Sequence, residues 1–141
     1  MREGTECLYL DRLRGHSSVP VVSTVGSRLP LHSTGVGKVL LAHASPEVQL
    51  AVLGDLHPLT PYTVTQPGTL QRQLEAVRRD DVATTAEEMS LGACSIAVPV
   101  RRGDTVVAAL GVVVADLRRD RTRLLAGLQV AARGIGRTLS R

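Results

Sequence analysis

At positions 30–42 the chain reads Pro30-Leu31-His32-Ser33-Thr34-Gly35-Val36-Gly37-Lys38-Val39-Leu40-Leu41-Ala42. This stretch predicts a glycine-bearing turn that leads directly into an apolar helix. The first N–H groups of a helix have no partner inside it, and the helix dipole is positive at that end. Gly35 and Gly37 let the backbone bend there and let a ligand approach closely. We therefore expect a cradle for a carboxylate, a phosphate or another small ligand at this helix start.

The same stretch does not match the phosphate-binding loop of nucleotide hydrolases. That motif has a glycine five residues before its Gly-Lys pair and a Ser or Thr directly after the pair. Here His32 and Val39 occupy those two positions. The sequence thus argues against nucleotide hydrolysis.

Length and composition indicate one domain over residues 1–141 with a substantial core. The chain has 141 residues, of which 43% are hydrophobic. Its apolar runs are far shorter than the roughly 20 residues of a membrane span, and no signal peptide opens it. We expect a cytoplasmic protein.

The charge pattern argues against direct nucleic-acid binding by this segment, although the formal net charge is +4. Of 17 basic residues only Lys38 is a lysine, and the arginines are interspersed with acids as on an ordinary solvated surface. Side chains on which bases could stack are almost absent, since the chain has two Tyr and no Phe or Trp.

The cysteines and histidines do not indicate a metal site. Cys7 and Cys94 form neither a metal-ligand spacing nor a disulfide framework. The four histidines show no helical metal-binding spacing. We expect no metal and no cofactor.

The patterning predicts a mixed α+β domain built on an antiparallel sheet. The expected strands cover residues 6–13, 19–25, 82–88, 94–100 and 105–115, with hairpins joining the first two and the last two. The first expected helix runs from Ser45 to Gly54. The second begins at Gln66 and has an apolar stripe of Leu70, Leu74 and Val77. The third begins at Asp120 and has one apolar face, formed by Leu124, Leu128, Ala131, Ile135 and Leu139. Because strand 105–115 is apolar on both faces, we place it in the middle of the sheet.

Four segments together resemble the C-terminal effector-binding domain of the IclR family of bacterial transcription regulators. They are residues 31–42, Leu59-Thr60-Pro61-Tyr62-Thr63-Val64-Thr65, residues 87–100 from Glu87-Glu88 to Pro99-Val100, and Val106-Val107-Ala108-Ala109-Leu110-Gly111-Val112-Val113. They match the family's glycine turn, its "LTPxTIT" loop, its "EE…CIAAPV" segment and its "VVAALSVS" strand.

The resemblance implies a GAF-like domain, in which helices flank an antiparallel sheet that carries a ligand cavity on one face. Members sense a small organic or aromatic acid and associate through this domain as homodimers or homotetramers. They contact DNA through a winged helix-turn-helix that precedes it, so we expect this chain to be the sensor half without the DNA-binding domain.

The resemblance also implies a ligand site. Its cradle is the backbone N–H groups of Gly35 and Val36, and Ser95 stands where many members have a cysteine. Neighbours in a strand face opposite ways, so the family register turns Ser95 to the pocket and Cys94 to the other side.

Three further positions of that site depart from the family pattern. Thr85 stands at the place of an acid, and Gly111 and Val113 replace serines of the central strand. A pocket that lacks these polar groups is less polar and roomier. We therefore predict an apolar or aromatic carboxylate as effector rather than a two- or three-carbon acid.

Some assignments stay open. Glu87 or Glu88 closes the pocket or lies at a solvated strand edge, and in a strand the two would not form a catalytic pair. Lys38 is expected at the surface or at an interface, and His32 is expected to bond the backbone locally. We expect no enzyme; the alternatives are thiol redox chemistry at Cys94 or a purely oligomerising domain.

Overall fold

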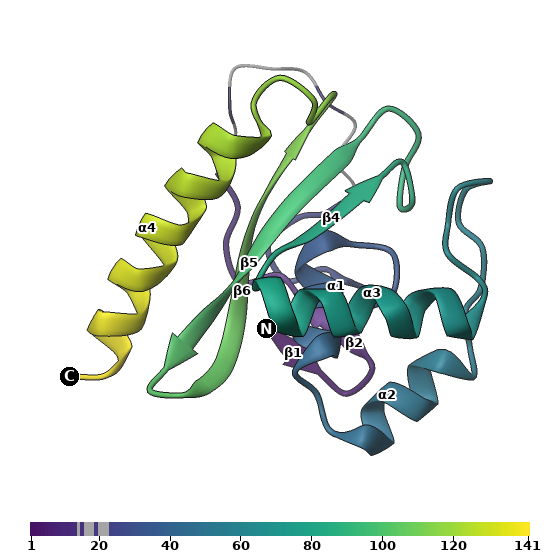
Figure 1. The fold of residues 1–141 in the computed structure, drawn as a ribbon, viewed down its shortest axis with the longest axis horizontal. Coiled ribbons are helices and arrows are strands. Elements are labelled where there is room, and N and C mark those ends of the chain that lie inside the picture. The colour runs from purple at the N-terminus through teal and green to yellow at the C-terminus, as the bar shows by residue number, and fades with distance from the viewer. Residues whose placement is uncertain (14, 16–18, 20–22) are drawn as a thin grey trace.

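The computed structural model describes residues 1–13, 15, 19 and 23–141. Figure 1 shows the elements in chain order. They are β1 (Arg2–Glu3), β2 (Glu6–Leu8), β3 (Arg28–Pro30), α1 (Gly35–Ala42), α2 (Pro46–Leu53), α3 (Pro67–Asp80), β4 (Ala83–Ala86), β5 (Cys94–Arg102), β6 (Thr105–Val114) and α4 (Arg121–Leu139).

The strands form two antiparallel sheets, ordered β1-β2-β3 and β4-β5-β6. In the second sheet Thr85, Ser95 and Val113 lie in one cross-strand row. Ala83, Ala97 and Gly111 form the next row on the same face, because residues two apart in a strand point the same way.

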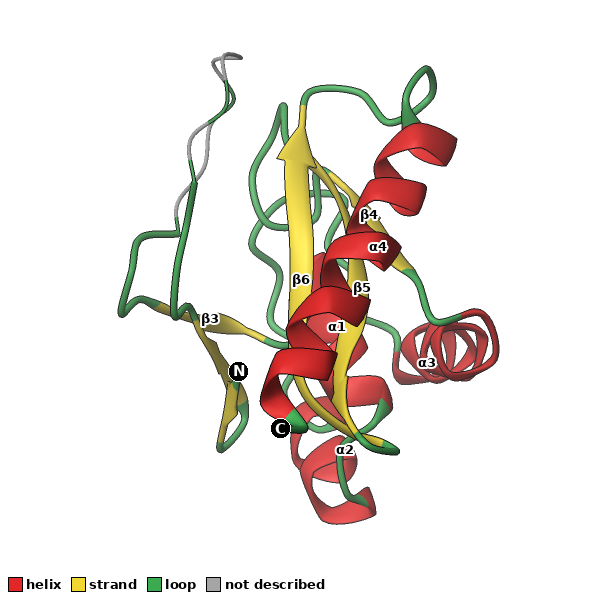
Figure 2. Ribbon diagram, turned by 90° about the vertical axis from the view of Figure 1, so that its left-hand side faces the viewer, coloured by secondary structure: helices red, strands yellow, loops and turns green. Residues whose placement is uncertain are grey.

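Helices cover both faces of the β4-β5-β6 sheet (Figures 1 and 2). Ile96, Val98 and Val100 pack with Leu128 and Ala132 of α4. On the other face Ala97 joins the larger core, built mainly from α1, α2 and α3 and including Val39, Leu41, Val52, Leu70, Leu74 and Val77. The predicted stripe of α3 is thus confirmed.

Local signals placed the first two helices as predicted. Thr34 caps α1, because its hydroxyl accepts a hydrogen bond from the Gly37 N–H at 3.0 Å. Ser45 caps α2, whose first turn contains Pro46, and Gly54 follows its last residue.

The predicted first hairpin is only partly correct. The strand at 6–13 is confined to β2, and the partner of β2 is β3, which begins after residue 25. Of that predicted second strand, residues 20–22 lie outside the described residues and 23–25 are not in a strand. The chain reverses at a turn in which the Ser27 N–H donates to the Thr24 carbonyl and Gly26 has a φ of +85°, so the returning strand begins later.

The prediction that residues 105–115 lie in the middle of the sheet is wrong. The middle strand is β5, and β6 is the edge of the described sheet. β6 is apolar on both faces because Leu110 and Val112 pack on the α4 side while Val106 and Ala109 pack against the core that contains α1. The apolar composition of β6 therefore indicates that both of its faces are covered. It does not indicate whether the strand lies at the edge or in the middle of the sheet.

The predicted face of α4 is wrong in its second half. Leu124 and Leu128 pack inward, but the next inward residue is Ala132, whereas Ile135 and Leu139 are 40% and 42% exposed. The reason is the close approach of Gly136 to β5, where an added Cβ would lie 2.6 Å from the Arg101 carbonyl oxygen. The inward stripe therefore follows i+4 spacing through Leu128, Ala132 and Gly136.

None of the helices in the described ranges combines the length and the apolar character that crossing a membrane requires.

Candidate functional site

The structure brings the six predicted site residues together on the α1 face of the β4-β5-β6 sheet. Thr85, Ser95 and Val113 form one row, and Gly111 lies in the next row on the same face. The first turn of α1 lies over these rows, since a Cβ on Gly35 would touch Ser95 and Ala97 and the Val36 side chain stands against Gly111.

Hydrogen bonds join three of these residues in a chain. The Gly35 N–H donates to Ser95 Oγ at 3.1 Å, and Ser95 Oγ lies 2.5 Å from Thr85 Oγ1. Gly35 and Thr85 are buried and Ser95 is half-buried. Because Ser95 accepts from the helix start, its own O–H can donate either to Thr85 or to an acceptor that enters the site.

Apolar groups surround this polar chain. An added Cβ at Gly111 would lie 3.0 Å from Val36 Cγ1, 3.0 Å from the Ile96 carbonyl oxygen and 3.1 Å from Ala97 Cβ. A side chain at this position would crowd Val36, which would have to shift by a few tenths of an ångström. Val113, on the same face, is 41% exposed, so the row that starts at Thr85 ends at an accessible apolar side chain.

The β4–β5 loop, residues 87–93, lies beside the helix start. The Ser33 hydroxyl contacts Met89 Sδ at 3.2 Å. From the 59–63 segment, the Thr60 hydroxyl donates to the Glu87 carbonyl and the Thr63 hydroxyl to the Glu88 carbonyl, both at 2.6 Å. The "LTPxTIT"-like segment therefore holds the loop in place.

Lys38 and Glu88 form a buried ion pair, although Lys38 was expected at the surface or at an interface. Lys38 Nζ donates to Glu88 Oε1 at 2.7 Å and to Gln73 Oε1 at 2.6 Å. Lys38 is 1% exposed and Glu88 7% exposed. Burial lowers the pKa of the Lys38 ammonium, and the Glu88 carboxylate opposes this shift.

Of the two alternatives for Glu87 and Glu88, the strand edge is wrong, because β4 ends at Ala86 and Glu87 has a φ of +57°. Glu87 instead accepts the Gly92 N–H within the loop at 2.8 Å. The sequence did carry a signal for the buried pair. Lys38 is the only charged residue of α1, whose other residues are apolar or glycine, so the helix has no solvated face on which to place it.

His32 makes a hydrogen bond to the backbone as predicted, but its partner is 25 residues away in the sequence and not local. Its Nε2–H donates to the His57 carbonyl at 2.9 Å, and the two imidazole rings meet edge to face with centroids 5.1 Å apart. Burial is the main cause that lowers the pKa of His32, which therefore stays neutral near neutral pH.

The two cysteines lie apart from the Gly35–Ser95–Thr85 chain. Cys94 is half-buried and, as predicted, its neighbour Ser95 is the residue that faces α1. Cys7 is buried in the core, and burial raises the pKa of its thiol. In the described part of the chain no group of three or more His, Cys, Asp or Glu side chains is placed to hold a metal ion.

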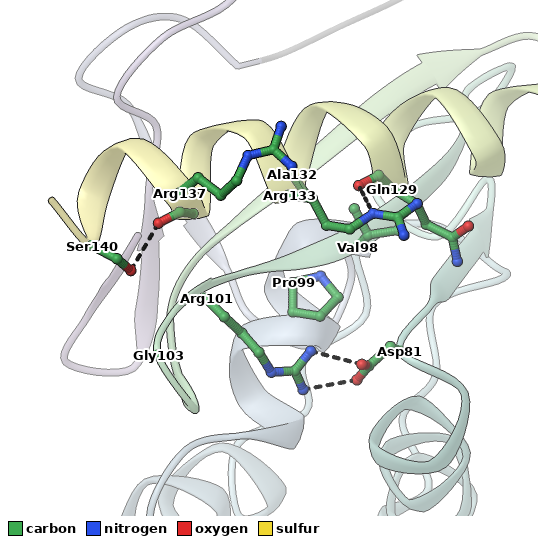
Figure 3. Close-up of a pocket in the computed structure, with 11 residues that line it drawn as sticks. Asp81, Val98, Pro99, Arg101, Gly103, Gln129, Ala132, Arg133, Arg137 and Ser140 are labelled. Carbon is green, nitrogen blue, oxygen red and sulfur yellow. Dashed lines mark hydrogen bonds and ion pairs between the residues drawn. The ribbon is translucent and has the colours of Figure 1, made fainter.

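Two hollows lie elsewhere. The larger, of about 620 Å³, runs between α4 and the end of β5 (Figure 3). Arg101 and Asp81 both line it and are joined by two hydrogen bonds, with Nη1–Oδ2 and Nη2–Oδ1 distances of 2.7 and 3.0 Å. The smaller, of about 200 Å³, is lined by residues that include Met1, His43 and Val106. Neither includes a predicted site residue.

The family described as bacterial transcriptional regulator IclR, C-terminal, matches residues 1–141. The chain belongs to the IclR family. Its structure is similar to that of an IclR homologue from Microbacterium hydrocarbonoxydans complexed with 4-hydroxybenzoate, with a TM-score of 0.91 and 37% identity over 98% of this chain and 57% of that one. It is also similar to the inducer-binding domain of the Acinetobacter transcription factor PobR, in a double mutant complexed with 3-hydroxybenzoic acid, with a TM-score of 0.79 and 32% identity over 96% of this chain and 83% of that one.

Among curated proteins, the p-hydroxybenzoate hydroxylase transcriptional activator of Acinetobacter baylyi is 46% identical over 78 residues, which are 54% of this chain and 29% of that protein. The Escherichia coli regulator XynR is 32% identical over 126 residues, 86% of this chain and 50% of that protein. This IclR-family chain thus spans half or less of the length of these curated relatives.

The family assignment confirms the predicted GAF-like α+β fold and the predicted role as an effector-binding regulatory domain. The relatives are named as transcriptional regulators, which agrees with the prediction that this chain is not an enzyme.

Proposed function

We propose that this IclR-type domain binds a small aromatic carboxylate of the hydroxybenzoate class where the first turn of α1 meets the β4-β5-β6 sheet. Six residues make the site: Gly35, Val36, Thr85, Ser95, Gly111 and Val113. The observation that carries the proposal is the hydrogen-bonded chain from the Gly35 N–H through Ser95 to Thr85 at the edge of an otherwise apolar surface.

The carboxylate occupies the polar end of this site. Gly35 donates to Ser95 and Gly37 donates to Thr34, whereas the Val36 N–H meets no acceptor within the described part of the chain. A ligand oxygen at the helix start receives the Val36 N–H and the Ser95 O–H, in the positive field of the helix dipole. Hydrogen bonds to a charged acceptor such as a carboxylate are stronger than those between two neutral groups.

The aromatic ring occupies the apolar end. Val36, Gly111 and Val113 offer no hydrogen-bond donor from their side chains, and the Val36 side chain packs directly against Gly111. A two-carbon acid has no group to cover these surfaces, whereas a benzene ring does. Two similar structures hold hydroxybenzoates, which supports the same class for this chain.

The proposal extends to the whole regulator. Effector binding alters the geometry of paired subunits, and through it the DNA binding of a winged helix-turn-helix domain outside this chain. We place residues 1–141 as one effector-binding domain in a cytoplasmic homodimer or homotetramer. Val130, Ile135 and Leu139 support self-association, because these α4 side chains are 64%, 40% and 42% exposed.

The test is calorimetric titration of the domain with 4-hydroxybenzoate, 3-hydroxybenzoate, benzoate and glyoxylate. We expect binding of the aromatic acids alone, and a loss of about tenfold or more in affinity for Ser95→Ala, which removes one hydrogen bond to a charged ligand. Ser140→Ala is the matched control, since Ser140 is an exposed serine whose hydroxyl bonds the Gly136 carbonyl at the end of α4. Binding of glyoxylate in preference to the aromatic acids would overturn the proposal.

A further inference from the structure

The ion pair of Lys38 and Glu88 joins three elements that are distant in the sequence. Lys38 lies in α1, one turn after Gly35; Glu88 lies in the β4–β5 loop; and Gln73, the second acceptor of the Lys38 ammonium, lies in α3. All hydrogen bonds of this cluster are 2.7 Å or shorter. The Lys38–Glu88 ion pair therefore attaches the β4–β5 loop to α1 one turn after its start.

Threonine hydroxyls provide two further anchors for the same loop. Thr60 bonds the Glu87 carbonyl and Thr63 bonds the Glu88 carbonyl. Inside the loop, the Glu87 N–H donates to the Ala93 carbonyl at 2.9 Å, and Gly92, with a φ of +80°, donates to the Glu87 carboxylate. These contacts favour one loop conformation and hold Glu87 in the left-handed region that non-glycine residues rarely adopt.

The loop also borders the proposed effector site directly. Thr85 and Ser95, which share a hydrogen bond, are one of the last pairs of β4 and β5 before the loop leaves the sheet. Met89, near the middle of the loop, contacts Ser33, two residues before Gly35. A displacement of the loop would move Met89 and change the position of Ser95, whose hydroxyl we assign to the carboxylate.

Stability alone is a weak reason for a buried ion pair. The cost of desolvating two charges offsets most of their attraction, so replacing both partners by apolar residues of similar size is often neutral or stabilising, whereas removing one partner is strongly destabilising. An ion pair with a defined geometry can instead favour one arrangement of the chain over its alternatives.

We propose that Lys38 and Glu88 are positioning residues that hold the β4–β5 loop against the start of α1 and thereby set the affinity of the effector site. This inference rests on the proposed function for its ligand, but the position of the loop can be measured without a ligand. Lys38 acts through Glu88 and the loop and does not itself contact the effector.

The test uses the apolar double variant Lys38→Met with Glu88→Leu. The matched control is Glu3→Leu with Arg28→Met, which removes an exposed ion pair of the β1-β2-β3 sheet. All variants and their parent carry Gly127→Ala and Gly134→Ala, because both α4 positions have open space for a Cβ and the added helix propensity protects against unfolding. Amide hydrogen exchange, melting temperature and affinity for 4-hydroxybenzoate are measured on each.

We expect the double variant to melt within a few degrees of its parent. The loop amides of Glu87, Gly92 and Ala93 should exchange at least tenfold faster, while the amides of β5 keep their protection. The affinity for 4-hydroxybenzoate should fall at least tenfold, and the control pair should change neither quantity.

Parent-like exchange of the loop amides in the double variant would overturn the inference, and so would a uniform increase in exchange across β5, which indicates a merely structural role. The failure of the proposed function looks different. In that case the parent itself binds no aromatic acid, and the exchange comparison still decides whether the ion pair positions the loop.

Discussion

The main-chain N–H of Gly35 donates to the hydroxyl of Ser95 across 3.1 Å, and this contact joins the first turn of α1 to the middle strand of the sheet. The approach is so close that a Cβ on Gly35 would lie 2.7 Å from Ser95 Oγ. A larger residue at position 35 would therefore have to displace the Ser95 hydroxyl.

Gly35→Ala should consequently destabilise the domain by about 1–3 kcal/mol, since the added methyl group displaces the Ser95 hydroxyl from its two hydrogen bonds. Urea unfolding measures the loss. Ser95→Ala removes the oxygen that the methyl group meets, so the same substitution should cost less in that background, with a coupling of about 1 kcal/mol or more. Equal costs in the two backgrounds would show that Ser95 is not the obstacle.

Two glycines of α4, Gly134 and Gly136, should respond in opposite ways to an added methyl group. Gly134 has open space for a Cβ, whereas a Cβ at Gly136 would lie 2.6 Å from the Arg101 carbonyl oxygen, a backbone atom that cannot move aside cheaply. We expect Gly134→Ala to raise the free energy of unfolding by about 0.5–1 kcal/mol through helix propensity. We expect Gly136→Ala, two residues further on, to lower it by about 1–3 kcal/mol through overpacking.

Thermal or urea unfolding of the two variants decides the matter, because helix propensity alone predicts the same sign for both. Stabilisation by Gly136→Ala would mean that α4 does not pack against β5 as closely as the structure has it.

The parts of the fold that were predicted from sequence depend on local interactions. The start of α1 followed from the glycine-bearing turn that precedes an apolar run, and the buried side of α3 followed from Leu70, Leu74 and Val77. The order of strands in a sheet depends instead on pairing between distant segments. For this reason residues 105–115 were correctly recognised as a strand but wrongly placed in the middle of the sheet, which β5 occupies.

The candidate site divides in the same way. The facing of Ser95 toward α1 followed from strand alternation and the family register, and the structure brings it to Thr85 and Gly35. The Lys38–Glu88 pair spans 50 residues of sequence, and periodicity cannot identify such a partner. What the sequence did contain was the lack of a polar face on α1, which requires a buried partner for Lys38 without naming it.

His32 should make the stability of the domain depend on pH. Burial lowers its pKa below the ordinary 6.5, so the folded state binds fewer protons than the unfolded chain as the pH falls below that value. The free energy of unfolding should therefore be fully developed above about pH 6.5 and should decrease as the pH falls toward the lowered pKa of the folded state. Urea unfolding between about pH 5 and 7.5 measures this slope.

His43 contributes in the same direction, since burial and the nearby Arg101 lower its pKa as well. The variants His32→Gln and His43→Gln separate the two contributions. Each should flatten part of the slope, and a slope unchanged by His32→Gln would contradict the role assigned to its burial.

Val113 tests the chemistry of the proposed effector. It lies on the row of Thr85 and Ser95 and is 41% exposed, so a smaller or polar side chain should change stability by less than about 1 kcal/mol. Val113→Ser adds a hydroxyl to the apolar end of the site, and Val113→Ala removes a similar amount of apolar surface without adding one.

If the ring of an aromatic acid covers this position, both variants should bind 4-hydroxybenzoate about three- to tenfold more weakly through lost apolar contact. Only Val113→Ser should gain affinity for glyoxylate or pyruvate, because only it supplies a further donor for a short polar acid. Calorimetric titration of the three proteins with these acids measures both changes, and unaltered affinity for the aromatic acid in both variants would place the ring elsewhere.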